Sequence, residues 1–264
     1  MKTDFCRHRR ILQPCGLEGH DYQVDPYVGC EHNCHYCYAL NAAESDWTKQ
    51  ILIHEAVDRT LSKELEEIPP QSIYIGMNSD PYQPVERTHR QTRRVLEILV
   101  EGGFSVCVLT KSPLMTRDVD VYREMDDPYL GFSLAFQNED DRRRFEPGAP
   151  PNAERLRALA ALRASGFRTY VLVCPVMPFV TDVTTVVEMA APVVEHIYVY
   201  RLRMERRTDR NWRRVARIVR RYYAEQLGIY RHAAFSAEHW YWRELRTRLE
   251  EFDPPHGVKL TLKI

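Results

Sequence analysis

Three cysteines that could bind a metal lie close together near the start of the chain, at Cys30, Cys34 and Cys37. Their spacing is C-x3-C-x2-C. Thiolates are soft ligands that suit iron–sulfur clusters, zinc or copper(I). Three thiolates on one loop can bind three irons of a four-iron cubane, which leaves the fourth iron without a protein ligand. An open coordination position is what distinguishes catalytic from structural zinc sites, so such a loop predicts a metal centre that carries out chemistry.

The same spacing also fits a structural zinc ion. The three cysteines would then be three of its four ligands, with the fourth elsewhere in the chain. On that hypothesis the protein is a non-catalytic, zinc-binding module that binds nucleic acid. The two hypotheses differ in metal content, because the first requires iron with sulfide and the second requires zinc alone.

The cysteine segment resembles the signature of the radical S-adenosylmethionine (SAM) enzymes, which carry an aromatic residue directly before the third cysteine, as Tyr36 is here. The resemblance implies a [4Fe–4S] cluster whose open iron binds the amino and carboxylate groups of SAM. Reduction by an electron donor such as flavodoxin or ferredoxin would cleave SAM to a 5′-deoxyadenosyl radical. That radical would abstract hydrogen from a substrate.

Further motifs follow the cysteines in a fixed order. They are Ser79-Asp80-Pro81-Tyr82-Gln83-Pro84-Val85-Glu86, Thr92-Arg93-Arg94-Val95-Leu96-Glu97, Thr110-Lys111-Ser112, Arg117-Asp118, Glu146-Pro147-Gly148-Ala149-Pro150 and Arg155-Leu156. This series is similar to the spore photoproduct lyase-like branch of the radical SAM proteins, also described as DNA repair photolyase-like. The resemblance covers about residues 22–180. It implies a lyase-like enzyme, with nucleic acid as the leading candidate substrate.

The resemblance implies roles for individual residues. The cluster ligands would be Cys30, Cys34 and Cys37. The SAM-binding residues would be Ser79, Asp80, Lys111 and Ser133. A lysine ammonium can pair with the methionyl carboxylate, and hydroxyls can bind ribose or amino groups. The candidate catalytic residues are Tyr36 and Tyr38, which flank the third cysteine, and Cys174.

One position departs from the lyase pattern. In spore photoproduct lyases a cysteine just before the counterpart of Ser79 donates hydrogen to the product radical, and this chain has Asn78 there. Asparagine has no weak X–H bond to donate. Tyr38 could relay a radical instead, and Cys174 could substitute for the thiol, although Cys174 also fits a small buried hydrophobic residue. The departure argues against thymine-dimer cleavage and leaves SAM cleavage unaffected.

The elements that must position these residues follow an α/β pattern. Apolar runs alternate with segments whose apolar residues recur at helical spacing. The six predicted strands of the core cover residues 22–28, 72–77, 104–109, 129–136, 169–176 and 196–202. Such an alternation indicates βαβ units around a parallel sheet buried on both faces. Periodicity does not distinguish a partial barrel from an open doubly wound sheet, and the family resemblance favours the partial (β/α)6 TIM-type barrel.

We expect three segments along the chain. Residues 1–20 are polar and predict an irregular N-terminal extension with a basic run. Its Cys6 and Cys15 could ligate a second metal, but two cysteines nine residues apart are a weak signal, which favours ordinary free thiols. Residues 21–207 would form the radical SAM core, with its functional residues on the loops that follow the strands. Residues 208–264 would pack on the core as helices over 208–227 and 236–252 and a strand over 258–264.

Composition narrows the classes of function. Lys plus Arg equals Asp plus Glu at 37 each, so the net charge favours no particular partner. No apolar run approaches the ~20 residues that cross a membrane, and the first residues lack the apolar core of a signal peptide. An odd number of cysteines, with three clustered, favours a reducing compartment over a disulfide framework. We therefore expect a cytoplasmic monomer that does not span a membrane.

The last third of the chain holds one strongly biased stretch. Residues 201–221 contain ten arginines and only Glu205 and Asp209 as acids. With Trp212, Tyr222 and Tyr223 interleaved, the stretch could be a phosphate-binding face with stacking aromatics. The alternative is a solvated helix face that pairs with acidic loops such as residues 139–141.

Overall fold

The structure, a computed structural model, describes residues 2–6, 10–43 and 46–264. Its core is an eight-stranded sheet with the order β11-β10-β9-β8-β7-β6-β3-β2. The strands are β2 (Leu12–Pro14), β3 (Tyr22–Val24), β6 (Ser72–Ile75), β7 (Ser105–Thr110), β8 (Tyr129–Ser133), β9 (Arg168–Val176), β10 (His196–Arg201) and β11 (Lys259–Lys263).

The six central strands, β3 and β6 to β10, confirm the predicted α/β class. They lie side by side in chain order, and every neighbouring pair among them is parallel. β11 extends the sheet in parallel beside β10, and β2 is antiparallel to β3. Among the described residues the two edge strands do not pair with each other, so the sheet remains open, which agrees with a partial rather than a closed barrel.

The N-terminal region differs from the sequence prediction. Residues 1–20 are not irregular throughout, because they contribute β2 and also β1 (Lys2–Cys6), which pairs in parallel with β5 (Gln50–His54). The predicted strand over 22–28 is two strands, β3 and β4 (Tyr27–Val28), and β4 pairs with β5 in a second, three-stranded sheet. Pro26 separates them, since proline has no N–H for a strand ladder. Part of the predicted basic run, residues 7–9, lies outside the described residues.

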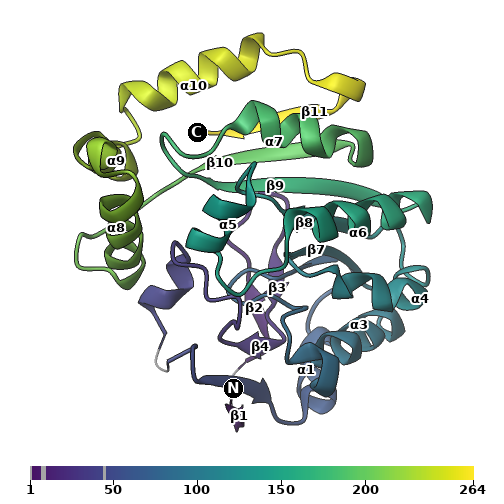
Figure 1. Cartoon of the computed structure of the whole chain (residues 1–264). Coiled ribbons are helices and arrows are strands. Elements are labelled where there is room, and N and C mark those ends of the chain that lie inside the picture. Colours follow the sequence, from purple (N-terminus) through teal and green to yellow (C-terminus); the bar gives the residue numbers. More distant parts are fainter. Residues whose placement is uncertain (1, 7–9, 44–45) are drawn as a thin grey trace.

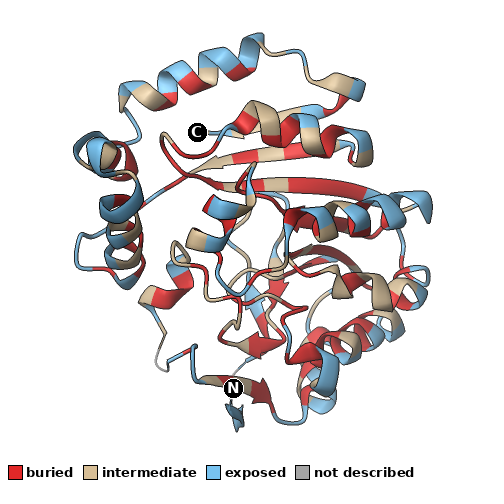
Figure 2. Ribbon diagram, in the orientation of Figure 1, coloured by how far each residue is buried: buried red, intermediate tan, exposed pale blue. Residues whose placement is uncertain are grey.

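Helices cover the outer face of the sheet, which Figure 1 shows most clearly for α1, α3, α6 and α7. The helices before β10 are α1 (Val57–Leu65), α2 (Glu86–His89), α3 (Gln91–Glu101), α4 (Val119–Tyr122), α5 (Glu139–Phe145), α6 (Asn152–Ala164) and α7 (Val183–Ala190). Each longer helix has one buried and one exposed side, whereas β7 to β9 are mostly buried (Figure 2). No described helix is long and apolar enough to cross a bilayer.

The C-terminal region forms three helices and the last strand. They are α8 (Arg210–Tyr222), α9 (Leu227–Phe235), α10 (Trp240–Glu251) and β11. The predicted helix over 208–227 thus ends at Tyr222, and a separate helix follows it. β11 is formed as the sequence predicts, and its pairing with β10 joins the C-terminal segment to the core sheet.

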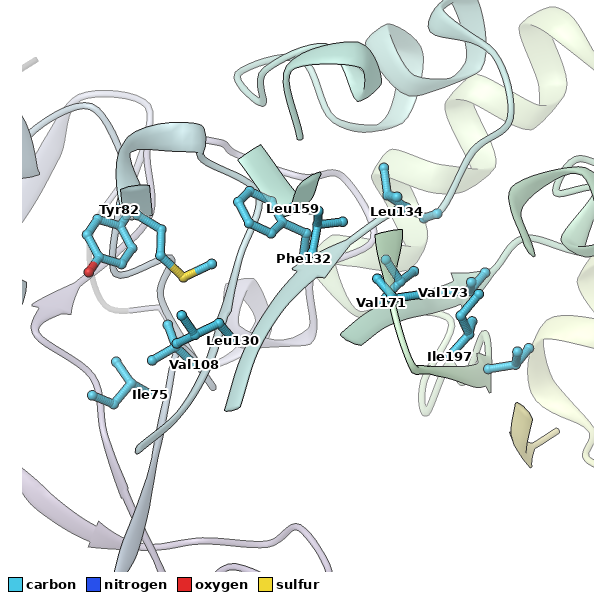
Figure 3. Close-up of a cluster of buried hydrophobic side chains, with 14 of the residues drawn as sticks. Ile75, Tyr82, Val108, Leu130, Phe132, Leu134, Leu159, Val171, Val173 and Ile197 are labelled. Atoms are coloured by element: carbon cyan, nitrogen blue, oxygen red, sulfur yellow. The ribbon is translucent and has the colours of Figure 1, made fainter. Parts of the chain in front are cut away.

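The main hydrophobic core lies between the eight-stranded sheet and the helices that cover its outer face, α6 among them. Leu130 and Phe132 from β8 pack there with Val171 and Val173 from β9 and with Leu159 from α6 (Figure 3). Each of these side chains is fully buried, and burying one contributes roughly 1.5–3 kcal/mol. Because strand side chains alternate between faces, this packing fixes the register of each strand and therefore the position of the loop at its carboxyl end.

Candidate functional site

One cavity brings the predicted site together. Its lining includes all three clustered cysteines, and it also includes Ser79, Asp80, Lys111, Ser133 and Tyr36. These residues come from four separate segments of the chain, namely the cysteine loop and the ends of β6, β7 and β8. The carboxyl ends of parallel strands lie at one edge of the sheet, which is where α/β barrels place their functional loops. Tyr38 and Cys174 are not among the described residues that line the cavity.

Gln83 holds the first half of the cysteine loop. Its buried side chain donates from Nε2 to the carbonyl oxygen of Gly29 at 2.9 Å, and its Oε1 accepts from the backbone N–H of Glu31 at 2.8 Å. The Glu31 carboxylate in turn accepts from the backbone N–H of Val85 at 2.5 Å. The segment that contains Gln83 and Val85 therefore fixes the backbone on either side of Cys30.

Gly148 holds the second half of the loop. Its N–H donates to the carbonyl oxygen of His32 at 3.1 Å, and His32 Nδ1 lies 3.0 Å from the Gly148 carbonyl oxygen. A Cβ atom at position 148 would come within 2.4 Å of the carbonyl oxygen of Glu31. Only glycine permits this close approach of two backbones, which gives the Glu146-Pro147-Gly148-Ala149-Pro150 motif a structural role beside the cysteines.

A buried ion pair lies behind the cysteine loop. Arg155 donates to Glu146 Oε2 at 2.7 Å, and both side chains are fully buried. Tyr36 Oη donates to the other Glu146 oxygen, and Arg155 also donates to the carbonyl oxygen of Ser133 at 2.8 Å. Burial raises the pKa of Glu146, but Arg155, Lys111 and the hydrogen bonds lower it below its usual value overall. The ionised pair thus connects the residue before Cys37 to the end of β8.

Asp80 is engaged by protein groups rather than left open to a ligand. Its carboxylate accepts from Thr110 Oγ1 at 2.6 Å and from the backbone N–H groups of Lys111 and Tyr82 at 2.8 and 2.9 Å. His32 Nε2 lies 3.2 Å away. Burial acts to raise the pKa of Asp80, but these partners lower it to about 2. The contacts fit a positioning residue that ties the loop after β6 to the loop after β7.

Two hydroxyls in the cavity lack partners. Ser79 Oγ and Ser133 Oγ are buried, and neither has a hydrogen-bond partner among the described residues. Buried polar atoms normally have one, so both hydroxyls are suited to a polar ligand. Lys111 lies on the same cavity, with Nζ 5.9 Å from the centre of the Tyr36 ring. Burial lowers the pKa of Lys111, but the charges of Cys34, Glu146 and Asp80 raise it overall.

Asp25 belongs to the site although no sequence motif indicates it. Its carboxylate accepts from both the backbone and the side-chain N–H of Asn78 at 2.8 Å, and from the Ser79 N–H at 3.1 Å. Burial raises the pKa of Asp25 despite these bonds. The only local signal is a carboxylate directly before Pro26, where β3 ends. Asp25 therefore fixes the position at which the chain departs from the lyase pattern.

The other two candidate catalytic residues lie close to the cavity. Tyr38 is 54% exposed, and its hydroxyl donates to the carbonyl oxygen of Met77 at 2.7 Å. Cys174 precedes Pro175, and burial raises the pKa of its thiol to about 11. Cys37 and Lys111 are near enough to shift that pKa as well. The structure therefore brings Cys174 into the neighbourhood of the cysteine loop without making it part of the cavity wall.

Comparisons with known proteins agree with this geometry. The family model described as the radical SAM superfamily matches residues 24–190, more than half of the chain. An uncharacterised protein of Methanocaldococcus jannaschii is 26% identical over 195 residues, which are 72% of this chain and 73% of that protein. An uncharacterised protein of Mycobacterium bovis is 31% identical over 173 residues, or 61% of this chain. A radical SAM Nα-GlyT isomerase of Pseudomonas phage M6 is 27% identical over 173 residues, or 63% of this chain.

These relatives differ in length, and solved structures share the fold. The match covers 51% of the mycobacterial protein and 35% of the phage protein. A mutant of spore photoproduct lyase aligns with 98% of this chain and 81% of its own, with a TM-score of 0.70 at 16% identity. The lyase complexed with dinucleoside spore photoproduct gives a TM-score of 0.66 over 98% and 82% of the two chains, also at 16% identity.

The buried pair gives a prediction about stability. Replacement of Arg155 by methionine (Arg155→Met) leaves the Glu146 carboxylate buried without its counter-ion, so the free energy of unfolding should fall by about 3–5 kcal/mol. Urea denaturation followed by circular dichroism measures the loss. Arg157→Met is the matched control, because Arg157 is exposed on the same helix and its replacement should change stability by less than about 0.5 kcal/mol. Equal effects of the two substitutions would contradict a special role for the pair.

Proposed function

The chain belongs to the radical SAM superfamily, and from that premise we propose that it is an enzyme that binds one [4Fe–4S] cluster and cleaves SAM reductively. The observation that carries the proposal is the single cavity that joins the three cysteines to two unpartnered hydroxyls and a lysine. Anaerobic purification tests it. A brown protein with about four irons and four sulfides that forms 5′-deoxyadenosine with dithionite supports the proposal, whereas a colourless protein with stoichiometric zinc supports the structural-zinc hypothesis.

The side chains that line the cavity suit both the [4Fe–4S] cluster and SAM. Cys30, Cys34 and Cys37 would hold the cluster, because thiolates are the ligands that iron–sulfur clusters require. Ser79 and Ser133 would hydrogen-bond SAM through hydroxyls that otherwise lack partners. Bound together, the cluster and SAM would supply the radical chemistry that removes hydrogen from a substrate.

The side chains around the cavity would bind SAM and hold the surrounding loops in position. The Lys111 ammonium is the only Lys or Arg side chain among the described residues that line the cavity, and it can pair with the methionyl carboxylate by a charge-assisted hydrogen bond. Glu146 fixes the Tyr36 ring beside the third cysteine. Asp80 and Asp25 fix the backbone on both sides of Ser79. The loops are thereby preorganised before any ligand arrives, which lowers the entropic cost of binding.

For the substrate we propose a nucleic-acid component. The support is the shared fold with a lyase solved in complex with a dinucleoside spore photoproduct. Asn78 limits the reaction, because its amide is held by Asp25 and offers no hydrogen atom to a product radical. We therefore propose a lyase-like enzyme that does not repair spore photoproduct efficiently.

The cluster assignment predicts the effect of removing single thiols. Changing Cys30, Cys34 or Cys37 to alanine should abolish the brown chromophore or sharply lower iron content, since each thiolate is one of three protein ligands. Absorbance and iron analysis of anaerobically purified variants measure this. Cys15→Ala is the control, because Cys15 does not line the cavity and its loss should leave iron content unchanged. Full iron content in all three loop variants would refute the assignment.

The role proposed for Lys111 predicts a defect confined to SAM. Lys111→Ala should keep the cluster but weaken SAM affinity roughly ten- to hundredfold, because a hydrogen bond to a charged group contributes about 1.5–3 kcal/mol. Anaerobic calorimetry of the cluster-bearing protein measures the change. Lys63→Ala, on the exposed side of α1, should bind SAM normally. Unchanged affinity in Lys111→Ala would remove this residue from the site.

The argument from Asn78 predicts the products of one anaerobic reaction. With a dinucleotide spore photoproduct as substrate, 5′-deoxyadenosine should form and restored thymine should be scarce, because no thiol stands beside the product radical. Proximity of reacting groups contributes many orders of magnitude in rate. Asn78→Cys should raise the thymine yield, as measured by chromatography and mass spectrometry. Efficient thymine release by the unmodified protein would overturn the argument.

A further inference from the structure

The side of α8 turned away from its buried valines carries a surface that the proposed chemistry does not use. Six arginines lie on it, at positions 210, 213, 214, 217, 220 and 221. At 3.6 residues per turn they fall within one arc of roughly 120°, opposite Val215 and Val219, which are fully buried. We name this surface the α8 arginine face.

The charge of this face is not balanced by the rest of the described chain. None of the six guanidinium groups forms an ion pair with a described carboxylate, whereas Glu139, Asp140 and Asp141 pair within their own helix with the arginines of α5. The predicted pairing of the acidic loop with this stretch is therefore wrong for those three acids. The first turn of α8 also lacks an acidic residue. Like charges three and four residues apart repel, and cations at a helix N-terminus oppose its dipole.

The same helix lies directly against the cysteine loop. Arg214 donates to Asn33 Oδ1 at 2.5 Å, and Asn33 lies between Cys30 and Cys34 in the chain. Asn211 Nδ2 donates to the carbonyl oxygen of Tyr36 at 3.3 Å, and Arg210 donates to that of Ala43 at 2.8 Å. Arg210 and Arg214 are themselves members of the α8 arginine face, so one edge of the face touches this region. A protein that docks on the face would therefore lie beside the cysteine loop.

The face does not lead into the cavity. No residue of α8 is among the described residues that line it, so a substrate bound along the arginines would not thereby reach the hydroxyls of Ser79 and Ser133. An electron donor does not have to enter the cavity, because electron transfer requires only that the donor lie close to the cluster. The position therefore favours a redox partner over the nucleic-acid contact that composition alone suggested.

We propose that the α8 arginine face docks the one-electron carrier protein that reduces this enzyme, a flavin or iron–sulfur protein with a carboxylate-rich surface. The proposal rests on the proposed function, since only a cluster-bearing enzyme needs the electron. In the step, the carrier is oxidised by one electron and the cluster is reduced by one, with no bond made or broken. Guanidinium groups suit the partner because they bind carboxylates through two parallel hydrogen bonds.

Charge reversal on the face provides the test. The holoenzyme with Arg213→Glu, Arg217→Glu and Arg220→Glu is compared with the unmodified holoenzyme, and an acidic flavodoxin serves as the probe. Anaerobic calorimetry should show flavodoxin affinity falling roughly tenfold or more, because complementary charges bring the partners together. Formation of 5′-deoxyadenosine should fall similarly with reduced flavodoxin and stay unchanged with dithionite. Affinity for the unmodified enzyme should also weaken with added salt.

Two further variants control for fold and for net charge. Arg59→Glu, Arg123→Glu and Arg157→Glu together make the same charge change at exposed positions outside α8, and they should leave flavodoxin binding intact. If the reversed α8 variant does not fold, as judged by circular dichroism, the corresponding triple change to glutamine replaces it, with a smaller loss in the same direction.

The outcomes separate the docking proposal from the proposed function. Unchanged flavodoxin affinity in the α8 variant overturns the docking proposal. So does a variant that keeps flavodoxin affinity and loses affinity for a single-stranded oligonucleotide, because the face would then bind nucleic acid. Absence of 5′-deoxyadenosine from the unmodified protein with dithionite defeats the proposed function instead, and calorimetry with flavodoxin still decides whether the face docks the carrier.

Discussion

The buried ion pair of Glu146 and Arg155 is the interaction on which the site depends. One carboxylate oxygen accepts from Tyr36, next to Cys37, and the guanidinium also binds the backbone of Ser133 at the end of β8. Both charges are fully buried, so neither can be removed alone without leaving an uncompensated ion. The pair thereby ties the cysteine loop to the sheet at a point where the chain itself has no direct connection.

Two other carboxylates near the cavity act in the same manner. Asp80 binds the loops after β6 and β7, and Asp25 binds the backbone of Asn78 and Ser79. Carboxylates that accept several N–H bonds are held rigidly and stay close to their partners. The groups that the proposed ligands would bind are therefore the thiols, the hydroxyls of Ser79 and Ser133, and Lys111. On this proposal, one set of side chains holds the loops in position and a different set binds the ligands.

Helix α8 contacts both the core and the cysteine loop, and it also carries exposed arginines. One side of the helix packs on the core through Val215 and Val219, and Arg214 contacts the cysteine loop. The remaining arginines face solvent without carboxylate partners among the described residues. The whole chain has as many acidic as basic residues, so the significance of this stretch lies in where the charge is concentrated. A protein with no net charge can still present a strong local electric field beside its cysteine loop.

The resemblance to a known family, and not periodicity, indicated Ser79, Lys111 and Ser133 in the cavity. The sequence by itself determined the α/β class, the approximate positions of the six central strands and the cysteine loop, because apolar periodicity and cysteine spacing are local properties of the chain. It did not determine β1, β5 or the break between β3 and β4, since these depend on pairing between segments distant in sequence. Nor could it assign Asp25 a role, because a single carboxylate before a proline carries no motif. Asp80 was expected to bind SAM, and only tertiary structure decided that its oxygens contact Thr110, Lys111 and Tyr82. Hydrogen bonds between loops depend on how the strands beneath them pack. That packing involves segments far apart in the sequence, so no single stretch of the chain predicts it.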